Sequence, residues 1–284
     1  MTLLTGSTGI GTMSVEEARK WLADKKEGGA VLLDVRQPQE YRSGHLPGAT
    51  LIPLPELPDR TGELDASKPV LAYCRSGNRS RAAAALLLTE GFQEVYSLDG
   101  GITAWNGRVA TGDYRQGLSL LKGGETAEEL TLLAWSLEEG SRLFYEKIAG
   151  LSADNGVKEV FYKIAGAEEK HKEKVLSAYR TVSGKEFSPD SPRGKDYEGV
   201  MEGGLRVEEA IAFLQGEGRS LLDMIEISMQ VETNALDLYI KMSREIKSGA
   251  AGKVFASLIE EEKQHLSRLG RLLEEKTGED RGAD

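Results

Sequence analysis

Two glutamate–histidine pairs carry the clearest chemical signal in this sequence. Glu168 and His171 are three residues apart, and Glu262 and His265 repeat that spacing 94 residues later. Residues three apart are neighbours on one face of an α-helix, so each pair offers a carboxylate and an imidazole side by side. Carboxylate with some imidazole suits iron or manganese, and zinc is an alternative. The spacing therefore predicts two metal-ligating pairs on two helices.

The same shift of 94 residues relates two further helical stripes. Glu138 corresponds to Glu232, and each glutamate is followed two turns later by a tyrosine, Tyr145 or Tyr239. The surrounding residues recur at intervals of three and four and are mostly apolar, which predicts that both glutamates face inward. Four buried carboxylates would repel one another and lose their hydration, which costs several kcal/mol each. Two divalent cations between the carboxylates remove that conflict.

These residues form the ligand pattern of a two-metal centre. One glutamate from each of two helices, with a Glu-x-x-His pair from each of two others, is the ligand set of di-iron and di-manganese carboxylate proteins. The donor set suits two iron or manganese ions, with zinc as a further alternative, and we expect no organic cofactor. The tyrosines are interpreted either as hydrogen-bond donors to the ligands or as core fillers. A metal-free, solvated acidic stripe is the opposing hypothesis. The expected ligands are Glu138, Glu168, His171, Glu232, Glu262 and His265.

Cys74 begins a second candidate site. It ends the apolar run VLAYC, which is typical of a buried strand, and the loop CRSGNRS leads from it into a helical stretch. Small residues allow such a loop to turn its N–H groups toward an anion at the helix N-terminus. With Arg75 and Arg79, these groups should lower the thiol pKa and stabilise a thiolate or persulfide. The competing interpretation is a buried apolar cysteine. The loop residues expected to bind substrate are Arg75, Ser76, Gly77, Asn78, Arg79 and Ser80.

Strands and helices alternate around Cys74. Three continuous apolar runs predict buried strands, at 30–35, 70–74 and 94–99. Helical patterns at 14–26 and 80–90 separate them. This alternation predicts an α/β fold with a parallel sheet flanked by helices, whose binding crevice lies at the carboxyl ends of the strands. Cys74 is at such an end.

After about residue 112 the sequence is helical throughout. Four long amphipathic patterns occur, at 126–149, 157–180, 218–247 and 250–274. A long polar stretch with a short helix near 206–215 joins the second to the third. Two close hairpins joined by one long crossover predict an all-α, ferritin-like four-helix bundle. The predicted organisation is an α/β domain at 1–112, a linker at 113–125, the bundle at 126–275 and a polar tail at 276–284.

Residues 13–110 resemble the rhodaneses, which are single-domain sulfurtransferases. The resemblance lies in CRSGNRS, LLDVRQPQEYRSGHLPGA and LDGGITAW. It implies that Cys74 takes a sulfane sulfur as a persulfide and passes it to a thiol or cyanide, while Arg79 and the loop amides hold the anionic donor. The loop from Cys74 to Arg79 is one residue shorter than in the related phosphatases and arsenate reductases, which favours sulfur transfer. Structural roles are expected for Asp34, Arg36 and Glu40.

Residues 126–275 resemble the rubrerythrin and ferritin-like di-iron family. The matching motifs are Glu138 with Glu168-x-x-His171, and Glu232 with Glu262-x-x-His265. The resemblance implies that the glutamates of the two Glu-x-x-His pairs bridge two irons, that the other two glutamates are terminal ligands, and that each iron has one histidine. Rubrerythrins usually carry a further carboxylate where this chain has Met229, and a four-cysteine iron centre that one cysteine cannot build.

Two functions of the bundle therefore stay open. The first is an oxidoreductase that acts on peroxide, dioxygen or an oxidised sulfur species and takes electrons from an external donor. The second is a non-catalytic module that binds metal or senses redox state beside the sulfurtransferase. The missing four-cysteine centre and Met229 favour the second.

The charge and the cysteine content limit the classes of partner that the chain is expected to bind. The chain has 36 basic and 46 acidic residues, a net charge of −10, without a basic cluster, which argues against nucleic acid and anionic membranes. Its apolar runs are shorter than the roughly 18 residues of a membrane helix. One cysteine excludes a disulfide framework within the chain. We expect a cytoplasmic protein with a sulfane-sulfur donor and a thiol acceptor and, by analogy with related bundles, a homodimer.

Overall fold

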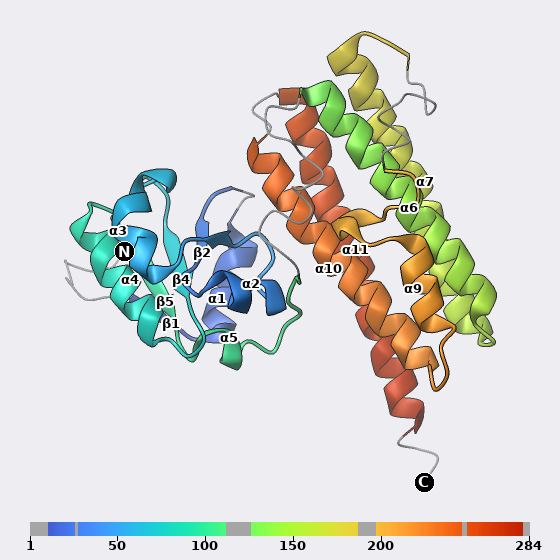
Figure 1. The fold of residues 1–284 in the computed structure, drawn as a ribbon, viewed down its shortest axis with the longest axis horizontal. Coiled ribbons are helices and arrows are strands. Elements are labelled where there is room, and N and C mark those ends of the chain that lie inside the picture. Colours follow the sequence, from blue (N-terminus) through green and yellow to red (C-terminus); the bar gives the residue numbers. More distant parts are fainter. Residues whose placement is uncertain (1–10, 26–27, 112–125, 187–196, 246–248, 281–284) are drawn as a thin grey trace, which may run out of the picture. The chain divides into compact units, whose positions relative to one another are not determined.

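The chain forms two compact units, residues 1–114 and 115–284 (Figure 1). The predicted linker at 113–125 lies outside the described residues. The computed structural model describes residues 11–25, 28–111, 126–186, 197–245 and 249–280.

The first unit contains a five-stranded parallel sheet. The three predicted strands are confirmed, whereas the two outer strands are too short to give a periodic signal. The strand order is β1-β5-β4-β2-β3, and all neighbours are parallel. The strands are β1 (Gly11–Met13), β2 (Val31–Asp34), β3 (Thr50–Leu51), β4 (Val70–Tyr73) and β5 (Val95–Leu98).

Helices cover both faces of this sheet. Alternate residues of β4 enter different apolar clusters, because successive side chains of a strand point to opposite faces. Ala72 and Cys74 pack on the side of α4, whereas Leu71 and Tyr73 pack on the side of α1. The parallel sheet predicted from the buried apolar runs is therefore confirmed. The helices are α1 (Val15–Asp24), α2 (Pro38–Ser43), α3 (Leu57–Arg60), α4 (Asn78–Thr89) and α5 (Gly101–Ala104).

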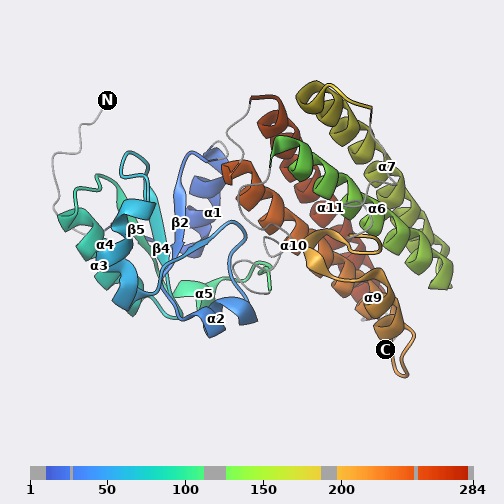
Figure 2. The ribbon, with the colours of Figure 1, turned by 45° about the horizontal axis from the view of Figure 1, so that its top comes forward.

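The second unit is a bundle of four long helices that lie side by side in both views (Figure 1, Figure 2). Helices α6 and α7 pack as one hairpin, and α10 and α11 pack as the other. None of the described helices combines the length and hydropathy needed to cross a membrane. The long helices are α6 (Ala127–Leu151), α7 (Asn155–Ser183), α10 (Leu221–Glu245) and α11 (Gly249–Asp280), and the shorter α9 spans Val207–Leu214.

Helix α11 is longer than the sequence pattern predicts. It continues through residues 276–280, part of the segment expected to be a polar tail. Lys276 in this extension forms an ion pair of 3.0 Å with Asp154, the N-cap residue of α7. Polar composition alone does not end a helix whose charged side chains can reach solvent or a partner.

Each long helix is apolar toward both ends of its core face and polar in the middle. In α6, Leu137 belongs to one buried apolar cluster and Phe144 to another, with Glu138 and Ser141 between them. Helices α7, α10 and α11 show the same order of apolar, polar and apolar residues. The bundle interior therefore consists of two apolar clusters separated by a layer of buried polar side chains.

The crossover between the hairpins packs directly on the bundle. Its short 3-10 helix η4 (Glu202–Gly204) contacts both α6 and α10. Gly140 of α6 permits this approach, because a Cβ atom there would lie 2.1 Å from the carbonyl oxygen of Val200. Val200, Met201 and Glu202 are buried. The segment thus adds side chains to the interior, which the sequence pattern does not predict.

Candidate functional sites

The cysteine lies between the end of β4 and the start of α4. Gly77, the residue before α4, has φ of +100°, which favours glycine and turns the loop back over the thiol. The backbone N–H of Gly77 donates to Sγ of Cys74 at 3.1 Å, and Oγ of Ser80 lies 3.7 Å from Sγ. Cys74 is 1% exposed. The loop therefore surrounds a buried sulfur atom with hydrogen-bond donors.

These donors lower the pKa of the Cys74 thiol. Burial raises the pKa, but the backbone N–H groups of Ser80, Ser76 and Gly77 and the Ser80 hydroxyl outweigh it. From the sequence, both loop arginines are expected to contribute to this lowering of the thiol pKa. The Arg75 side chain is instead exposed. Arg79 does interact with Cys74, but Glu40 raises the pKa of Arg79 more than Cys74 does. Backbone N–H groups, rather than arginine charge, are thus the main stabilisers of the thiolate.

Arg79 is held by a carboxylate from outside the loop. Its Nη1 and Nη2 atoms donate to the two carboxylate oxygens of Glu40, on α2, at 2.8 and 2.7 Å. This pairing is the main cause that lowers the pKa of Glu40 to about 2. Asp34 and Arg36 form a separate buried pair, with Nη2 2.6 Å from Oδ2. Glu40 therefore orients a loop arginine, beyond the structural role expected for it.

Helix α5 forms hydrogen bonds to the backbone of the cysteine loop. The carbonyl oxygen of Cys74 accepts from the N–H of Ile102 at 2.8 Å, and that of Arg75 accepts from the N–H of Thr103 at 3.1 Å. Gly101 has φ of +57°, and a Cβ there would lie 2.4 Å from the carbonyl oxygen of Cys74. The glycines of LDGGITAW thus allow α5 to dock against the cysteine loop.

Replacement of Gly101 with alanine should therefore disturb the thiol site. We expect a destabilisation of about 2–4 kcal/mol, from the left-handed backbone and the clash with the loop carbonyl, together with a loss in the sulfur transfer that the resemblance to the rhodaneses implies. Urea unfolding and a thiosulfate assay measure the two effects. Gly62→Ala is the control, because a Cβ at Gly62 has open space around it. Equal stability of G101A and G62A would contradict this explanation of the motif.

The lowered thiol pKa should also appear in alkylation rates. The thiolate is the reactive form, so the rate rises with pH up to the pKa and is constant above it. We expect the inflection for Cys74 below the ordinary thiol pKa of about 8.5. Ser80→Ala should move the inflection upward, since it removes one donor to Sγ. Mass spectrometry of iodoacetamide-treated protein gives the rates, and an inflection at or above the ordinary value would contradict the proposed stabilisation.

The six expected metal ligands meet in the polar layer of the bundle. All six side chains are buried, and they come from all four long helices. The imidazole rings of His171 and His265 stack with their centroids 5.3 Å apart. The ligands are Glu138 on α6, Glu168 and His171 on α7, Glu232 on α10, and Glu262 and His265 on α11.

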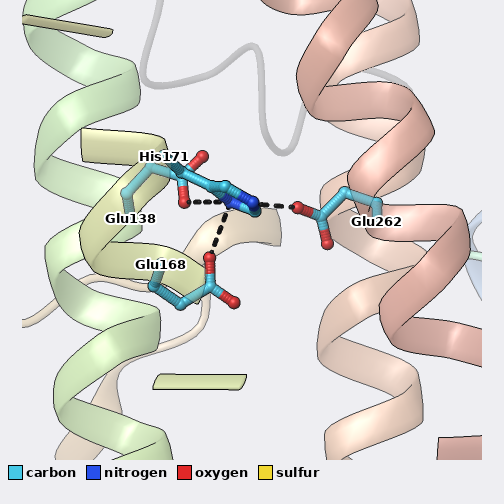
Figure 3. A group of neighbouring side chains, drawn as sticks. All are labelled: Glu138, Glu168, His171 and Glu262. Carbon is cyan, nitrogen blue, oxygen red and sulfur yellow. Dashed lines mark hydrogen bonds and ion pairs between the residues drawn. The ribbon is translucent and has the colours of Figure 1, made fainter. Parts of the chain in front are cut away.

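The first group of ligands surrounds Nδ1 of His171 (Figure 3). This atom lies 3.1 Å from Oε2 of Glu138, 2.9 Å from Oε2 of Glu168 and 4.0 Å from Oε1 of Glu262. The four residues offer one ligand atom each within 4.8 Å of one another. One cation can therefore be reached by all four.

The second group lies around Nδ1 of His265. This atom is 3.3 Å from Oε2 of Glu232, 3.3 Å from Oε1 of Glu168 and 3.7 Å from Oε2 of Glu262. Glu168 and Glu262 thus each present one oxygen to His171 and the other to His265. This is the arrangement that two bridging carboxylates need.

The charge balance of this layer fits bound cations. In the described part of the chain, neither oxygen of Glu168 nor of Glu262 makes a hydrogen bond, although all four atoms are buried. Burial raises the pKa of both carboxyls well above the usual range, and Glu232 and Glu202 raise it further. Buried carboxylates without donors are unfavourable unless a proton or a cation compensates them. The donor set and its unsatisfied oxygens therefore suit a pair of divalent ions.

Both expected tyrosines contact the glutamates of α6 and α10. Tyr145 of α6 donates its hydroxyl to Glu232 of α10, and Tyr239 of α10 lies 2.8 Å from Oε1 of Glu138 on α6. Burial, followed by the neighbouring carboxylates, raises the pKa of both phenols well above the usual value, so both remain protonated donors. These contacts favour the interpretation of the tyrosines as hydrogen-bond donors that orient the glutamates.

Two carboxylates near the site are not predicted from the sequence. Oε2 of Glu261 lies 2.6 Å from Nε2 of His171. It is the middle glutamate of a run of three on α11, where the pattern singles out only Glu262. Glu202 reaches the layer from the crossover and contacts Tyr239. The crossover has no helical periodicity, so nothing in the sequence marks Glu202 as inward-facing.

Two separate regions of the chain match known protein families. A family model described as Rhodanese-like domain matches residues 14–108, and one described as Rubrerythrin matches residues 129–273. Thiosulfate sulfurtransferase GlpE of Pseudomonas syringae pv. syringae is 44% identical over 80 residues, which are 28% of this chain and 76% of that protein.

Part of this chain is also similar to solved structures. One is a rhodanese-like domain protein from Staphylococcus aureus, 24% identical, with 37% of this chain and 100% of that chain covered and a TM-score of 0.34. Another is CoADR-RHD of Bacillus anthracis, 33% identical, with a TM-score of 0.31. The match to the latter covers 34% of this chain but only 16% of that chain.

Proposed function

The chain belongs to the rhodanese family through residues 14–108 and to the rubrerythrin family through residues 129–273, and we propose that it has two reaction centres. One centre is a sulfurtransferase site at Cys74. The other is a di-iron carboxylate centre in the bundle. We place the corresponding domains at 1–112 and 126–275.

The proposed sulfur transfer has two steps. The Cys74 thiolate attacks the outer sulfur of thiosulfate, and the S–S bond of thiosulfate breaks as sulfite leaves with the electron pair. Cyanide or a thiolate then attacks the outer sulfur of the Cys74 persulfide, and Cys74 leaves as a thiolate. Each step exchanges one bond to sulfur for another, so neither needs an added oxidant or reductant.

The observation that carries this proposal is the set of N–H groups aimed at Sγ. The same groups that lower the pKa of Cys74 can hold the negative charge of the persulfide. Arg79, oriented by Glu40, supplies positive charge for an anionic donor. A test is mass spectrometry of the protein after incubation with thiosulfate. We expect the peptide with Cys74 to gain one sulfur atom, and thiocyanate formation without that gain would contradict a persulfide.

The proposed metal centre uses the six residues of the polar layer. Glu168 and Glu262 would bridge two iron ions, Glu138 and Glu232 would be terminal ligands, and each histidine would bind one ion through Nδ1. When bound, iron would exchange electrons with peroxide, dioxygen or an oxidised sulfur species. The phenol hydroxyls of Tyr145 and Tyr239 hold the terminal carboxylates, and the apolar clusters at either end exclude water. The unsatisfied oxygens of the bridging glutamates carry this proposal.

A second candidate function is a metal-binding or redox-sensing bundle without catalysis. The single cysteine of the chain favours it, because a four-cysteine iron centre that would deliver electrons cannot be built from these residues. A catalytic metal centre would instead have to receive its electrons from another protein or molecule.

Mixing the ferrous protein with peroxide distinguishes the two. Rapid oxidation, followed by repeated turnover when an external electron donor is supplied, would support the oxidoreductase. One slow oxidation without turnover would support the non-catalytic module. Absorbance during stopped-flow mixing and the amount of peroxide consumed per chain are the measurements.

A further inference from the structure

Glu202 is a buried carboxylate that belongs to none of the four long helices. It lies in η4 of the crossover and is 0% exposed. Its Oε1 atom is 2.5 Å from the hydroxyl of Tyr239. Its Oε2 atom is buried and makes no hydrogen bond with any described residue. A carboxylate in this position needs a compensating positive charge or a proton.

Tyr239 connects Glu202 to a metal ligand. The Tyr239 hydroxyl lies 2.8 Å from Oε1 of Glu138 as well as 2.5 Å from Oε1 of Glu202. A phenol has one hydrogen to donate, so it satisfies only one of these oxygens at a time. Two carboxylates therefore meet at one donor, beside Nδ1 of His171, which is 3.1 Å from Oε2 of Glu138.

The other half of the repeat is built differently. There the Tyr145 hydroxyl contacts Glu232 and the carbonyl oxygen of Ser228. Tyr145 thus has one carboxylate and one neutral oxygen as partners, whereas Tyr239 has two carboxylates. His171 also has Glu261 within 2.6 Å of Nε2, whereas the residue 94 positions before Glu261 is Ala167. The half of the site around His171 thus has more carboxylates than the half around His265.

Two neighbouring residues of α6 allow Glu202 to reach the site. Gly140 makes room for the backbone of Val200, and Oγ of Ser141 accepts from the N–H of Glu202 at 3.4 Å. The residues 94 positions later are Asn234 and Ala235, which provide neither the space nor the hydroxyl acceptor. The crossover therefore packs on α6 through residues that α10 does not repeat. The two hairpins, which are otherwise related by the 94-residue repeat, differ at Glu202.

We propose that Glu202 is a seventh ligand of the metal centre and binds the ion shared by Glu138 and His171. This inference rests on the metal centre proposed above and adds a ligand from outside the four helices. The two metal positions then differ: one has an additional terminal carboxylate and one does not. A harder or more highly charged ion is favoured at the position with the extra carboxylate.

Glu202→Gln tests the assignment, because glutamine keeps the size of the side chain and removes its charge. Metal-free full-length protein is titrated with Fe(II) without oxygen in a calorimeter. Wild type should bind two ions with unequal affinities. E202Q should bind the tighter ion about 10–100-fold more weakly. The exposed Glu198 of the same segment provides the matched control E198Q, which should behave as wild type.

Gly140→Ala gives a second variant that retains the carboxylate. Its added Cβ should displace the crossover at Val200 and so withdraw Glu202, which weakens the same ion. Gly150→Ala, in the same helix with open space around it, is the control. Mössbauer spectra of the iron-loaded protein provide a readout other than activity: two distinct iron environments in wild type, and more similar ones in E202Q and G140A.

The outcomes separate the two proposals. If wild type binds two ions and E202Q binds both with unchanged affinity and spectra, Glu202 is not a ligand and only this inference fails. If wild type binds no iron, the metal centre itself is wrong. Loss of the tighter ion in both E202Q and G140A, with circular dichroism unchanged, supports the assignment.

Discussion

Replacement of Cys74 with serine is expected to reduce the transfer of sulfur from thiosulfate to cyanide to the uncatalysed rate. The loss should be at least about a thousandfold, because the reaction depends on one nucleophile. A serine hydroxyl remains protonated near neutral pH and cannot exchange S–S bonds, although it fits the same space. The donors around the site remain in place, so they cannot by themselves carry the sulfur atom.

Colorimetric assay of thiocyanate measures this effect. Circular dichroism and iron content serve as controls and should equal those of wild type, because Cys74 and the proposed metal ligands lie in different units. Undiminished turnover by C74S would remove Cys74 from the reaction and leave the loop without a proposed role.

Replacement of either glutamate proposed as a bridging ligand should have the other large effect. In Glu168→Gln or Glu262→Gln, the carboxylate whose two oxygens face the two histidines becomes a neutral amide with one oxygen and one NH2 group. Both metal positions lose a charged ligand at once, so we expect iron affinity to fall at least about a hundredfold and the bound iron to drop below two per chain. Elemental analysis after dialysis against a weak chelator gives the content.

The metal-free proteins should respond in the opposite direction. Removal of a buried carboxylate without hydrogen-bond donors is neutral or stabilising when no cation is bound. We therefore expect metal-free E168Q to melt at or above the temperature of metal-free wild type. Glu169→Gln, on the exposed face next to Glu168, is the control for both measurements. Metal-free E168Q that melts well below metal-free E169Q would contradict the charge argument.

Both sites place a negative charge where water is excluded, and they stabilise it in different ways. At Cys74, fixed N–H groups of the loop act on a single sulfur atom. In the bundle, the hydroxyls of Tyr145 and Tyr239 lie within hydrogen-bond distance of Glu232 and Glu138, while the oxygens of Glu168 and Glu262 make no hydrogen bond with a described residue. The first arrangement is complete within the described residues, whereas the second needs a compensating proton or the cations proposed above.

The sequence predicts those features that depend on regular spacing. The parallel sheet follows from the three apolar runs, and the bundle follows from the helical period of its four long patterns. The convergence of Glu138, Glu168 and Glu262 is predictable because a helical period sets the face on which each side chain lies. The tyrosines share this property, although their hydrogen bonds to the glutamates become visible only in the structure.

Other features depend on contacts between distant segments without regular spacing. Glu202 enters the polar layer because Gly140 makes room for an irregular segment some 60 residues away, and neither residue belongs to a periodic pattern. Likewise, Glu40 reaches Arg79 across the fold from α2. The dominance of loop N–H groups over arginine charge in lowering the Cys74 pKa depends on backbone direction, which side-chain identity does not fix.

Measurement of the iron content of the intact protein is the most direct test of the proposed metal centre. Full-length protein is loaded with Fe(II) without oxygen, dialysed, and analysed for iron and protein concentration. Two ions per chain are predicted, with loss of iron in E168Q and retention in E169Q. A folded, helical wild-type protein that retains no iron would contradict the claim that cations hold the buried carboxylates together.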